Sequence, residues 1–341
     1  MIFRKSLLFA PVLALTTVMS AVSGAGTSSA DDMSLYHPSS GWAQSLMGLG
    51  NVTSTGAGVT IYVIDGGMRV DLPEFGGRAS IAYDYYDQVN KSGNYTYANG
   101  VDDHATQVAV AAAGSTWGIA KQATIKAVKV SNCAGDCYDI NAEIAGINWV
   151  KDNHQGPSVA VITSNTTRLN DSSEALLNAV NALAAANVFV AVSAGNVDTA
   201  ELAPTPTYNA CFNPPANAAG PMVVAASDAS DLDVWSEITP PHPPTQQKIW
   251  TSAYGGCVDI FAPGQWIDTK FTTGADTIQS GTSFSAPYVA AAGALYKQKF
   301  GDAASPTIKS WLIQHAAPMN RLHASWIYGS DPNARLNLNG L

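Results

Sequence analysis

Short apolar runs alternate with segments of helical spacing along most of this chain, and this alternation limits the folds that it can adopt. The apolar runs cover residues 58–65, 123–130, 158–164, 188–196, 222–228 and 258–264. Helical spacing is found at residues 104–114, 139–153, 172–186, 282–300 and 306–315. Strands that are apolar throughout are buried on both faces, as in a parallel sheet covered by helices. We therefore predict a doubly wound α/β domain, with a mostly parallel sheet and helices on both faces.

The charge balance argues against polyanionic partners. The chain of 341 residues has 17 Lys and Arg against 26 Asp and Glu, a formal net charge of −9. A nucleic-acid-binding domain needs a basic face, and the sequence contains no cluster of Lys or Arg. We expect no nucleic-acid partner, no attraction to an anionic membrane surface, and a monomeric protein.

The N-terminus has the pattern of a secretion signal. Arg4 and Lys5 precede an apolar stretch at residues 7–18, and small residues follow with possible cleavage after Ala25 or Ala30. The stretch is too short to span a bilayer, although a buried helix or an anchor is the alternative. We predict a signal peptide at residues 1–25, with cleavage at about 25–30, and one secreted domain at residues 31–341.

Four cysteines are compatible with an oxidising compartment. Cys133 and Cys137 enclose a small loop, whereas Cys211 and Cys257 lie far apart in the sequence. Of the three possible connectivities, we favour Cys133–Cys137 and Cys211–Cys257. A zinc site is the alternative, but no CxxC or HxxxH pattern accompanies these cysteines.

Four polar residues stand at the ends of predicted elements. Asp65 ends an apolar strand, His104 and Ser283 each open an alanine-rich helix, and Asn196 ends the run "SAGN". Taken singly, each has an ordinary explanation as a cap, a turn residue or an exposed first-turn residue. An acid at the end of an apolar strand is costly, however, unless it is paired or functional.

Together these residues supply the groups of a nucleophilic catalyst. A serine hydroxyl needs a histidine base, and the histidine needs an acid that fixes its tautomer and stabilises the imidazolium. Asn196 could donate its amide N–H to an oxyanion, with the backbone N–H of Ser283 as second donor. Asp102 and Asp103 adjoin His104, but sequence neighbours on a helix do not face each other, so we assign the acid to Asp65.

The blocks "YVIDGG", "DDHATQVAV", "SAGN" and "SGTSFSAPYVAAA" resemble the signature blocks of the subtilases, the subtilisin-like serine proteases. The segments "GIAKQATIKAVKV" and "YGGCVDIFAPG" are similar to strands of this family, and the sequence pattern as a whole most resembles the proteinase K branch. The resemblance runs from about residue 42 to the C-terminus. It implies a secreted endopeptidase with Asp65 as triad acid, His104 as general base, Ser283 as nucleophile and Asn196 in the oxyanion hole.

The resemblance also implies that an extended peptide binds as a strand against two segments of the enzyme. The residues that correspond here are Ser164, Asn165, Thr166 and Thr167 in one segment, and Ser193, Ala194 and Gly195 in the other.

This sequence departs from the family pattern in both the histidine block and the substrate groove. Ala105 and Gln107 stand where the family usually has Gly and a second His, and Val110 replaces a later Gly. The groove segment reads "SNTT" in place of Ser-Leu-Gly-Gly. Because the glycines let the substrate backbone approach closely, we expect a narrow substrate range and a modest rate.

Further expectations concern the rest of the domain. The Pro-rich segment at about residues 237–250 is predicted to be a surface insertion, and sequons begin at Asn51, Asn90, Asn94, Asn165 and Asn170. Secreted subtilases usually have a longer pro-segment than the short stretch before residue 42, so the domain should fold unaided or with a partner. We expect no required cofactor; family members often bind calcium, but no ligands can be assigned.

Three functions are therefore compatible with the sequence. The first is a secreted serine endopeptidase acting on protein or peptide substrates through an acyl-enzyme. The second uses the same scaffold as a peptide ligase or macrocyclase, or as a processing protease of narrow specificity. The third is a non-catalytic secreted binding protein, which the presence of all the triad residues disfavours.

Overall fold

The structure, a computed structural model, describes residues 38–86, 102–131, 139–164, 171–198, 209–228, 237–238, 249–319 and 332–341. All of them lie in one compact unit, Pro38–Leu341. The predicted signal peptide and the Cys133–Cys137 pair lie outside the described residues, as do most of the segment at 237–250 and four sequon asparagines, Asn90, Asn94, Asn165 and Asn170.

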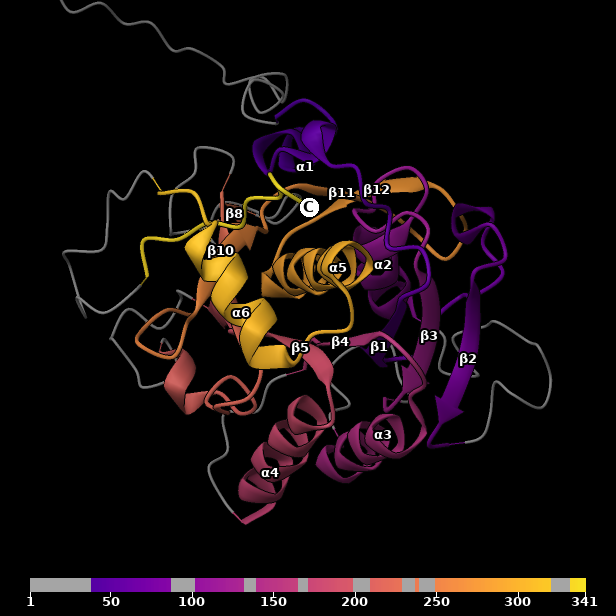
Figure 1. The fold of residues 1–341 in the computed structure, drawn as a ribbon, viewed down its shortest axis with the longest axis vertical. Helices are drawn as coiled ribbons and strands as arrows, with labels where there is room; N and C mark the ends of the chain where they lie inside the picture. Colours follow the sequence, from indigo (N-terminus) through magenta and orange to yellow (C-terminus); the bar gives the residue numbers. More distant parts are fainter. Residues whose placement is uncertain are drawn as a thin grey trace, which may run out of the picture. The chain divides into compact units, whose positions relative to one another are not determined.

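A seven-stranded sheet forms the centre of the molecule (Figure 1), in the order β10-β7-β5-β4-β1-β3-β2. All its neighbouring strands run parallel. Its strands are β1 (Thr60–Asp65), β2 (Ala79–Asp84), β3 (Thr124–Lys129), β4 (Ser158–Ile162), β5 (Val188–Ser193), β7 (Met222–Ser227) and β10 (Ile260–Pro263). The fold class predicted from the sequence is confirmed.

The winding of the sheet reverses between β1 and β4. The chain passes from β1 to β2 and β3 on one side, and then crosses to β4, from which β5, β7 and β10 continue on the other side. The pairing of β1 with β4 ends at Ile64 opposite Ile162, so the next residues, Asp65 and Thr163, lie side by side at the carboxyl edge. In open α/β sheets, ligands bind at the carboxyl edge at such a switch point.

Helices cover both faces of the sheet. One apolar core joins the sheet to α2 (Asp103–Ala113), α5 (Thr282–Phe300) and α6 (Ser305–Gln314). A second core joins the opposite face to α3 (Ile140–Asn153) and α4 (Asp171–Ala185), which lie together below the sheet in Figure 1. Alternate residues of β1 point to the two cores, as the period of a strand requires.

Helix α5 runs through the larger core and approaches the sheet closely. A Cβ built on Gly293 would lie 2.2 Å from Cδ1 of Phe189, on β5. The alanines of α5 at 290–292 are fully buried as well. Small side chains therefore let the helix that carries Ser283 lie directly against the central strands.

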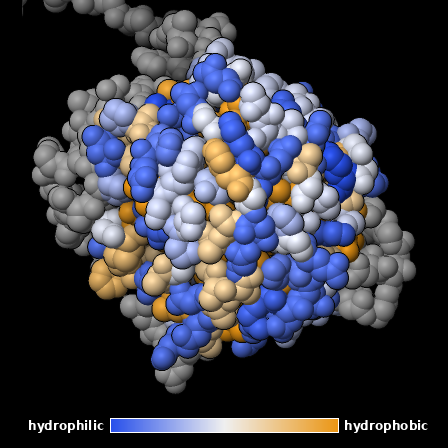
Figure 2. Space-filling model, viewed as in Figure 1, coloured by the Kyte–Doolittle hydropathy of each residue, from blue (hydrophilic) through white to orange (hydrophobic). Residues whose placement is uncertain are grey.

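Short elements complete the described part of the fold. They are α1 (Trp42–Leu46), the 3₁₀ helices η2 (Leu49–Asn51), η3 (Pro73–Phe75) and η6 (Ala210–Phe212), the sheet β6 (Asn196–Asp198), β9 (Ile249–Ser252) and β8 (Glu237–Ile238), and the hairpin β11 (Ile267–Lys270) with β12 (Asp276–Gln279). The face in Figure 2 is mainly hydrophilic, with hydrophobic residues interspersed.

Several boundaries differ from those expected. β5 ends at Ser193 and Asn196 opens β6, whereas the sequence predicted one strand through 196. The predicted insertion has β8 and the start of β9 at its two ends. No helix in the described ranges is long and apolar enough to cross a membrane.

Candidate active site

Asp65 ends β1 at the switch point, where its carboxylate accepts several hydrogen bonds. The backbone N–H of Gly66 donates to Oδ1 at 2.6 Å, and the hydroxyl of Thr163 donates to Oδ2. The side chain of Asp65 is only 11% exposed. These donors compensate for burying the charge.

His104 lies in the first turn of α2, beside Asp65. Its Nδ1 is 3.0 Å from Oδ2 and 3.1 Å from Oδ1 of the Asp65 carboxylate. With the Nδ1–H donated to the acid, Nε2 of the neutral ring is free to accept a proton. The side chain remains 44% exposed, so a substrate can reach it.

The pair of Asp65 and His104 shifts both pKa values. Burial alone would raise the pKa of Asp65, but the charge of His104 and the hydrogen bonds from His104, Thr163 and Gly66 hold it below its usual value. Burial lowers the pKa of His104, but the charge and the hydrogen bond of Asp65, with a contribution from Asp102, raise it to about 9. The arrangement therefore favours the ion pair.

Asp102 and Asp103, the acids next to His104 in the sequence, have other hydrogen-bond partners. Asp102 is the N-cap of α2 and accepts the Ala105 N–H at 2.9 Å. Asp103 accepts the Thr272 N–H at 2.6 Å. Burial and the nearby charge of Asp65 raise the pKa of Asp102 to about 7. Among the described residues, Asp65 is the acid that hydrogen-bonds to the His104 ring.

Ser283 is the second residue of α5, which has Gly281 as N-cap. It is 7% exposed, and the ring of the next residue, Phe284, stands edge-on to His104 with centroids 5.8 Å apart. Within the described ranges, no hydrogen bond joins Ser283 to His104. Catalytic hydrogen bonds are often long in ligand-free structures and tighten when substrate binds. Ser283 therefore lies near the Asp65–His104 pair, but its hydrogen bond to His104 is not formed here.

The side-chain amide of Asn196 is oriented by Thr282. Its Oδ1 accepts both the N–H of Thr282, at 2.9 Å, and the hydroxyl of Thr282, at 3.0 Å. The Thr282 hydroxyl in turn accepts the Gly195 N–H at 3.3 Å. Two donors on Oδ1 leave Nδ2 as the outward group, and Asn196 is exposed. A second donor could come from the Ser283 N–H, because the first N–H groups of a helix have no partner within it.

The predicted substrate segment at 193–195 is already paired inside the protein. The Ser193 hydroxyl donates to Thr163 O at 2.9 Å, and the Ala194 N–H donates to Val224 O at 2.9 Å. Gly195 O accepts the Ala253 N–H at 2.8 Å. The segment can therefore form a wall of the site, but these groups are not available to a substrate strand.

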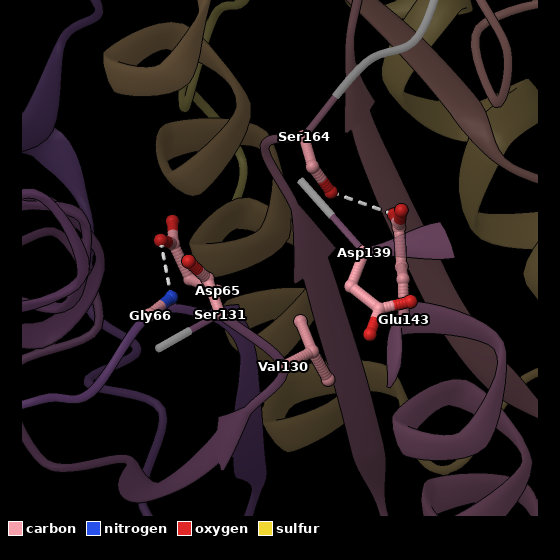
Figure 3. Close-up of a pocket in the computed structure, with 7 residues that line it drawn as sticks. All are labelled: Asp65, Gly66, Val130, Ser131, Asp139, Glu143 and Ser164. Atoms are coloured by element: carbon pink, nitrogen blue, oxygen red, sulfur yellow. Dashed lines mark hydrogen bonds between the residues drawn. The ribbon is translucent and has the colours of Figure 1, made fainter. Parts of the chain in front are cut away.

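In the other predicted segment, Ser164 alone lies within the described residues; Asn165, Thr166 and Thr167 do not. Its hydroxyl donates to Oε1 of Glu143 on α3 at 2.6 Å (Figure 3). The two residues line a small cavity of about 40 Å³ beside the catalytic acid, with Asp65, Gly66, Val130, Ser131 and Asp139. Ser164 thus tethers the start of the segment to α3.

The structure contains the expected Cys211–Cys257 disulfide, which joins residues 46 positions apart. It fastens the loop of η6 to the turn after β9, next to Asn213, whose amide donates to Ala194 O at 3.4 Å. In the described part of the chain, no group of three or more His, Cys, Asp or Glu side chains could hold a metal ion.

Sequence reasoning missed three residues that contact the predicted ones: Thr163, Thr282 and Phe284. Thr282 and Phe284 flank Ser283, so their position next to the predicted nucleophile could have identified them from the sequence. Thr163 had none, because its contact with Asp65 depends on the pairing of β1 with β4.

Comparison with known proteins gives a consistent result. The profile of the Subtilase family matches residues 56–330. The extracellular serine proteinase of Thermus sp. (strain Rt41A) is 34% identical over 78% of this chain and 57% of the relative. The alkaline serine exoprotease A of Vibrio alginolyticus is 32% identical over 77% of this chain and 42% of the relative. The chain thus spans about half the length of these relatives.

A solved structure is similar over most of its length. The crystal structure of a cold adapted subtilisin-like serine proteinase aligns with a TM-score of 0.67 and 28% sequence identity, covering 84% of this chain and 91% of that one. The family profile covers well over half of the present sequence. This chain belongs to the subtilase family.

Proposed function

We propose that the protein is a secreted serine endopeptidase that hydrolyses peptide bonds through an acyl-enzyme. The observation that carries the proposal is the hydrogen-bonded pair of Asp65 and His104, 3.0 Å apart, with Ser283 at the adjacent start of α5. The names of two relatives, a serine proteinase and a serine exoprotease, support the activity, and the extracellular location in the name of the Thermus proteinase supports export.

The reaction follows from the position of each group. Nε2 of His104 accepts the proton of Ser283 Oγ while Oγ forms a bond to the substrate carbonyl carbon. The carbonyl electron pair moves to oxygen, where Nδ2 of Asn196 and the Ser283 N–H donate hydrogen bonds. The oxyanion then collapses, the C–N bond breaks, and His104 gives the proton to the departing amine. A water molecule repeats the sequence and releases the acid.

A fluorophosphonate probe and a peptide library test this function. The probe should label the wild-type protein at Ser283, and Ser283→Ala should lose both labelling and peptidase activity, the latter by about 10⁶-fold. Masses of the library products should correspond to hydrolysis. Joined or cyclic peptides would instead establish ligation, and a folded protein without labelling would establish a binding protein.

Three attributes belong to the same proposal. The exported protein should begin near residue 26 or 31, which N-terminal mass analysis would determine. It should be a monomer, which light scattering would measure. No cofactor should be required, so a chelator should leave the chemical step intact; a fall in melting temperature with the chelator alone would reveal structural calcium.

A further inference from the structure

The hydroxyl of Thr163 contacts the catalytic acid at Oδ2, an oxygen that also lies 3.0 Å from Nδ1 of His104. Thr163 follows β4 directly, and Asp65 ends β1, the parallel neighbour of β4. Because Ile64 pairs with Ile162, the next residue on each strand reaches the carboxyl edge at the same level. The contact therefore bridges the two strands between which the winding of the sheet reverses.

The direction of the hydrogen bond is set by charge. The pKa of Asp65 lies below its usual value, so its carboxylate is ionised and can only accept. The Thr163 hydroxyl must therefore donate its proton to Oδ2, while Gly66 donates to Oδ1. Donors on both oxygens resist rotation of the carboxylate about its Cβ–Cγ bond.

Thr163 is itself fixed in place. Its side chain is buried, with 7% of the residue exposed, and its carbonyl oxygen accepts the Ser193 hydroxyl at 2.9 Å. Ser193 ends β5, two residues before Gly195 and three before Asn196. The Thr163 backbone thus contacts the end of β5, which precedes the segment that leads to Asn196, while its hydroxyl contacts the end of β1, which carries the acid.

We propose that Thr163 is a positioning residue of the triad, whose hydroxyl holds the Asp65 carboxylate at the rotation that keeps an oxygen aimed at Nδ1 of His104. The proposal rests on the peptidase function proposed above. It assigns no contact with substrate to Thr163, because the residue acts only through Asp65.

Loss of this hydroxyl has an electrostatic consequence that a purely structural role would lack. The O–H dipole points its positive end at Asp65 and so opposes the imidazolium of His104. Its removal should make the carboxylate more attractive to that cation and raise the pKa of His104. Asp102 and Asp103 on α2, Lys129 on β3, and Asp139 and Glu143 at the N-terminal end of α3 are titratable groups near the pair, and they are unchanged in every variant below.

Thr163→Val and Thr163→Ser are the informative variants, since valine keeps the shape without the hydroxyl and serine keeps the hydroxyl. We expect Thr163→Val to lower kcat by about 10-fold to 100-fold, the range for a hydrogen bond to a charged group, with KM within about twofold. Thr163→Ser should restore kcat to within about threefold. The acid limb of the kcat/KM profile should move to higher pH in the valine variant alone.

Thr269→Val is the matched control. Thr269 is fully buried on β11, and its hydroxyl donates to a backbone oxygen, that of Gln107, at 3.0 Å. This variant loses a buried hydroxyl without touching Asp65, so its acid limb should stay in place. An equal shift in Thr269→Val would overturn the proposal.

Titration of His104 by NMR gives a readout that does not need activity. In the Ser283→Ala background, Thr163→Val should raise the pKa of His104, and Thr163→Ser should leave it unchanged. If Thr163→Val does not fold, Thr163→Cys replaces it, because a thiol is a weak donor. The kcat of Thr163→Cys should then lie below that of Thr163→Ser and above about one hundredth of the wild-type value. If Thr163→Val leaves both the pKa of His104 and kcat unchanged, the positioning role is wrong. If the probe does not label the wild-type protein, only the proposed peptidase function is wrong.

Discussion

His104 takes its proton affinity from the carboxylate beside it. Asp65 outweighs the effect of burial and raises the pKa of His104 to about 9. Only the neutral ring can accept the serine proton, so we expect kcat/KM to increase with pH along an acid limb well above 6.5, the ordinary value. A pH profile with a small ester substrate measures the limb, and a midpoint at or below 6.5 would contradict this expectation.

The same shift affects folding in the opposite sense. A group whose pKa is higher in the folded protein binds its proton more tightly there. The stabilisation by the His104–Asp65 pair is therefore complete below about pH 6.5 and is lost as the pH rises through about 9. Activity should thus increase over the range in which this contribution to stability declines.

Asn196 is expected to act on the transition state rather than on substrate binding. Its Oδ1 is held by both donors of Thr282, which leaves Nδ2 for the oxyanion. Asn196→Ala should lower kcat by about 10²–10³-fold with little change in KM. Asn153→Ala is the control, because the amide of this exposed asparagine donates to Trp149 O at the C-terminal end of α3. Equal kcat values for both variants would exclude the assigned role.

At the scale of single residues, the sequence predicted those site residues that stand at the ends of strands and helices. The strand before Asp65 and the helix starts at His104 and Ser283 could be recognised locally. The partners of the hydroxyl groups could not be recognised, because Thr163 meets Asp65 across 98 residues and Thr282 meets Asn196 across 86. Such contacts depend on strand order and packing.

Helix α2 begins at a buried carboxyl group with two opposing effects. Asp102 caps the helix through Ala105, but burial and Asp65 raise its pKa to about 7. Because the folded state binds this proton more tightly, wild-type stability should fall as the pH rises from about 4 to about 7. Asparagine retains a capping oxygen without the charge.

The two substitutions separate these effects. Asp102→Asn should gain stability relative to wild type as the pH rises through that window, whereas Asp102→Ala should lose about 1 kcal/mol at acidic pH through the missing cap. Urea unfolding at pH 4.5 and pH 8 measures both. Parallel pH dependence of wild type and Asp102→Asn would refute the raised pKa.

Among the elements, long periodic segments were predictable and short ones were not. The expected helices at 104–114 and 282–300 correspond to α2 and α5 within one residue. The three-residue strand β6 and the hairpin of β11 and β12 were missed, since so few residues show no period. The predicted strand through Asn196 was too long because Gly195, with φ of 106°, turns the chain after β5.

For the whole molecule, the disulfide contributes through the unfolded state. Cys211 and Cys257 close a loop with a sequence separation of 46. Replacing both by serine should lower the free energy of unfolding by about 2–4 kcal/mol, measured by denaturant titration. Wild type in a reductant should lose at least this amount, because reduction also opens the predicted Cys133–Cys137 bond; an unchanged value in both cases would contradict the expectation.

The fold class followed from the alternation of buried strands and helices, because few other architectures bury both faces of a sheet. The position of β4 beside β1 did not follow, since periodicity gives no strand order. The order matters most for the site, because it brings Thr163 to Asp65.

Every member of the candidate triad is attached to the middle of the molecule rather than to a peripheral lobe. Asp65 comes from a strand with neighbours on both sides, and Ser283 from the helix that fills the larger core. Such segments open only when the entire domain melts. Heat should therefore inactivate this catalyst abruptly, with no window in which an intact globule has lost its chemistry.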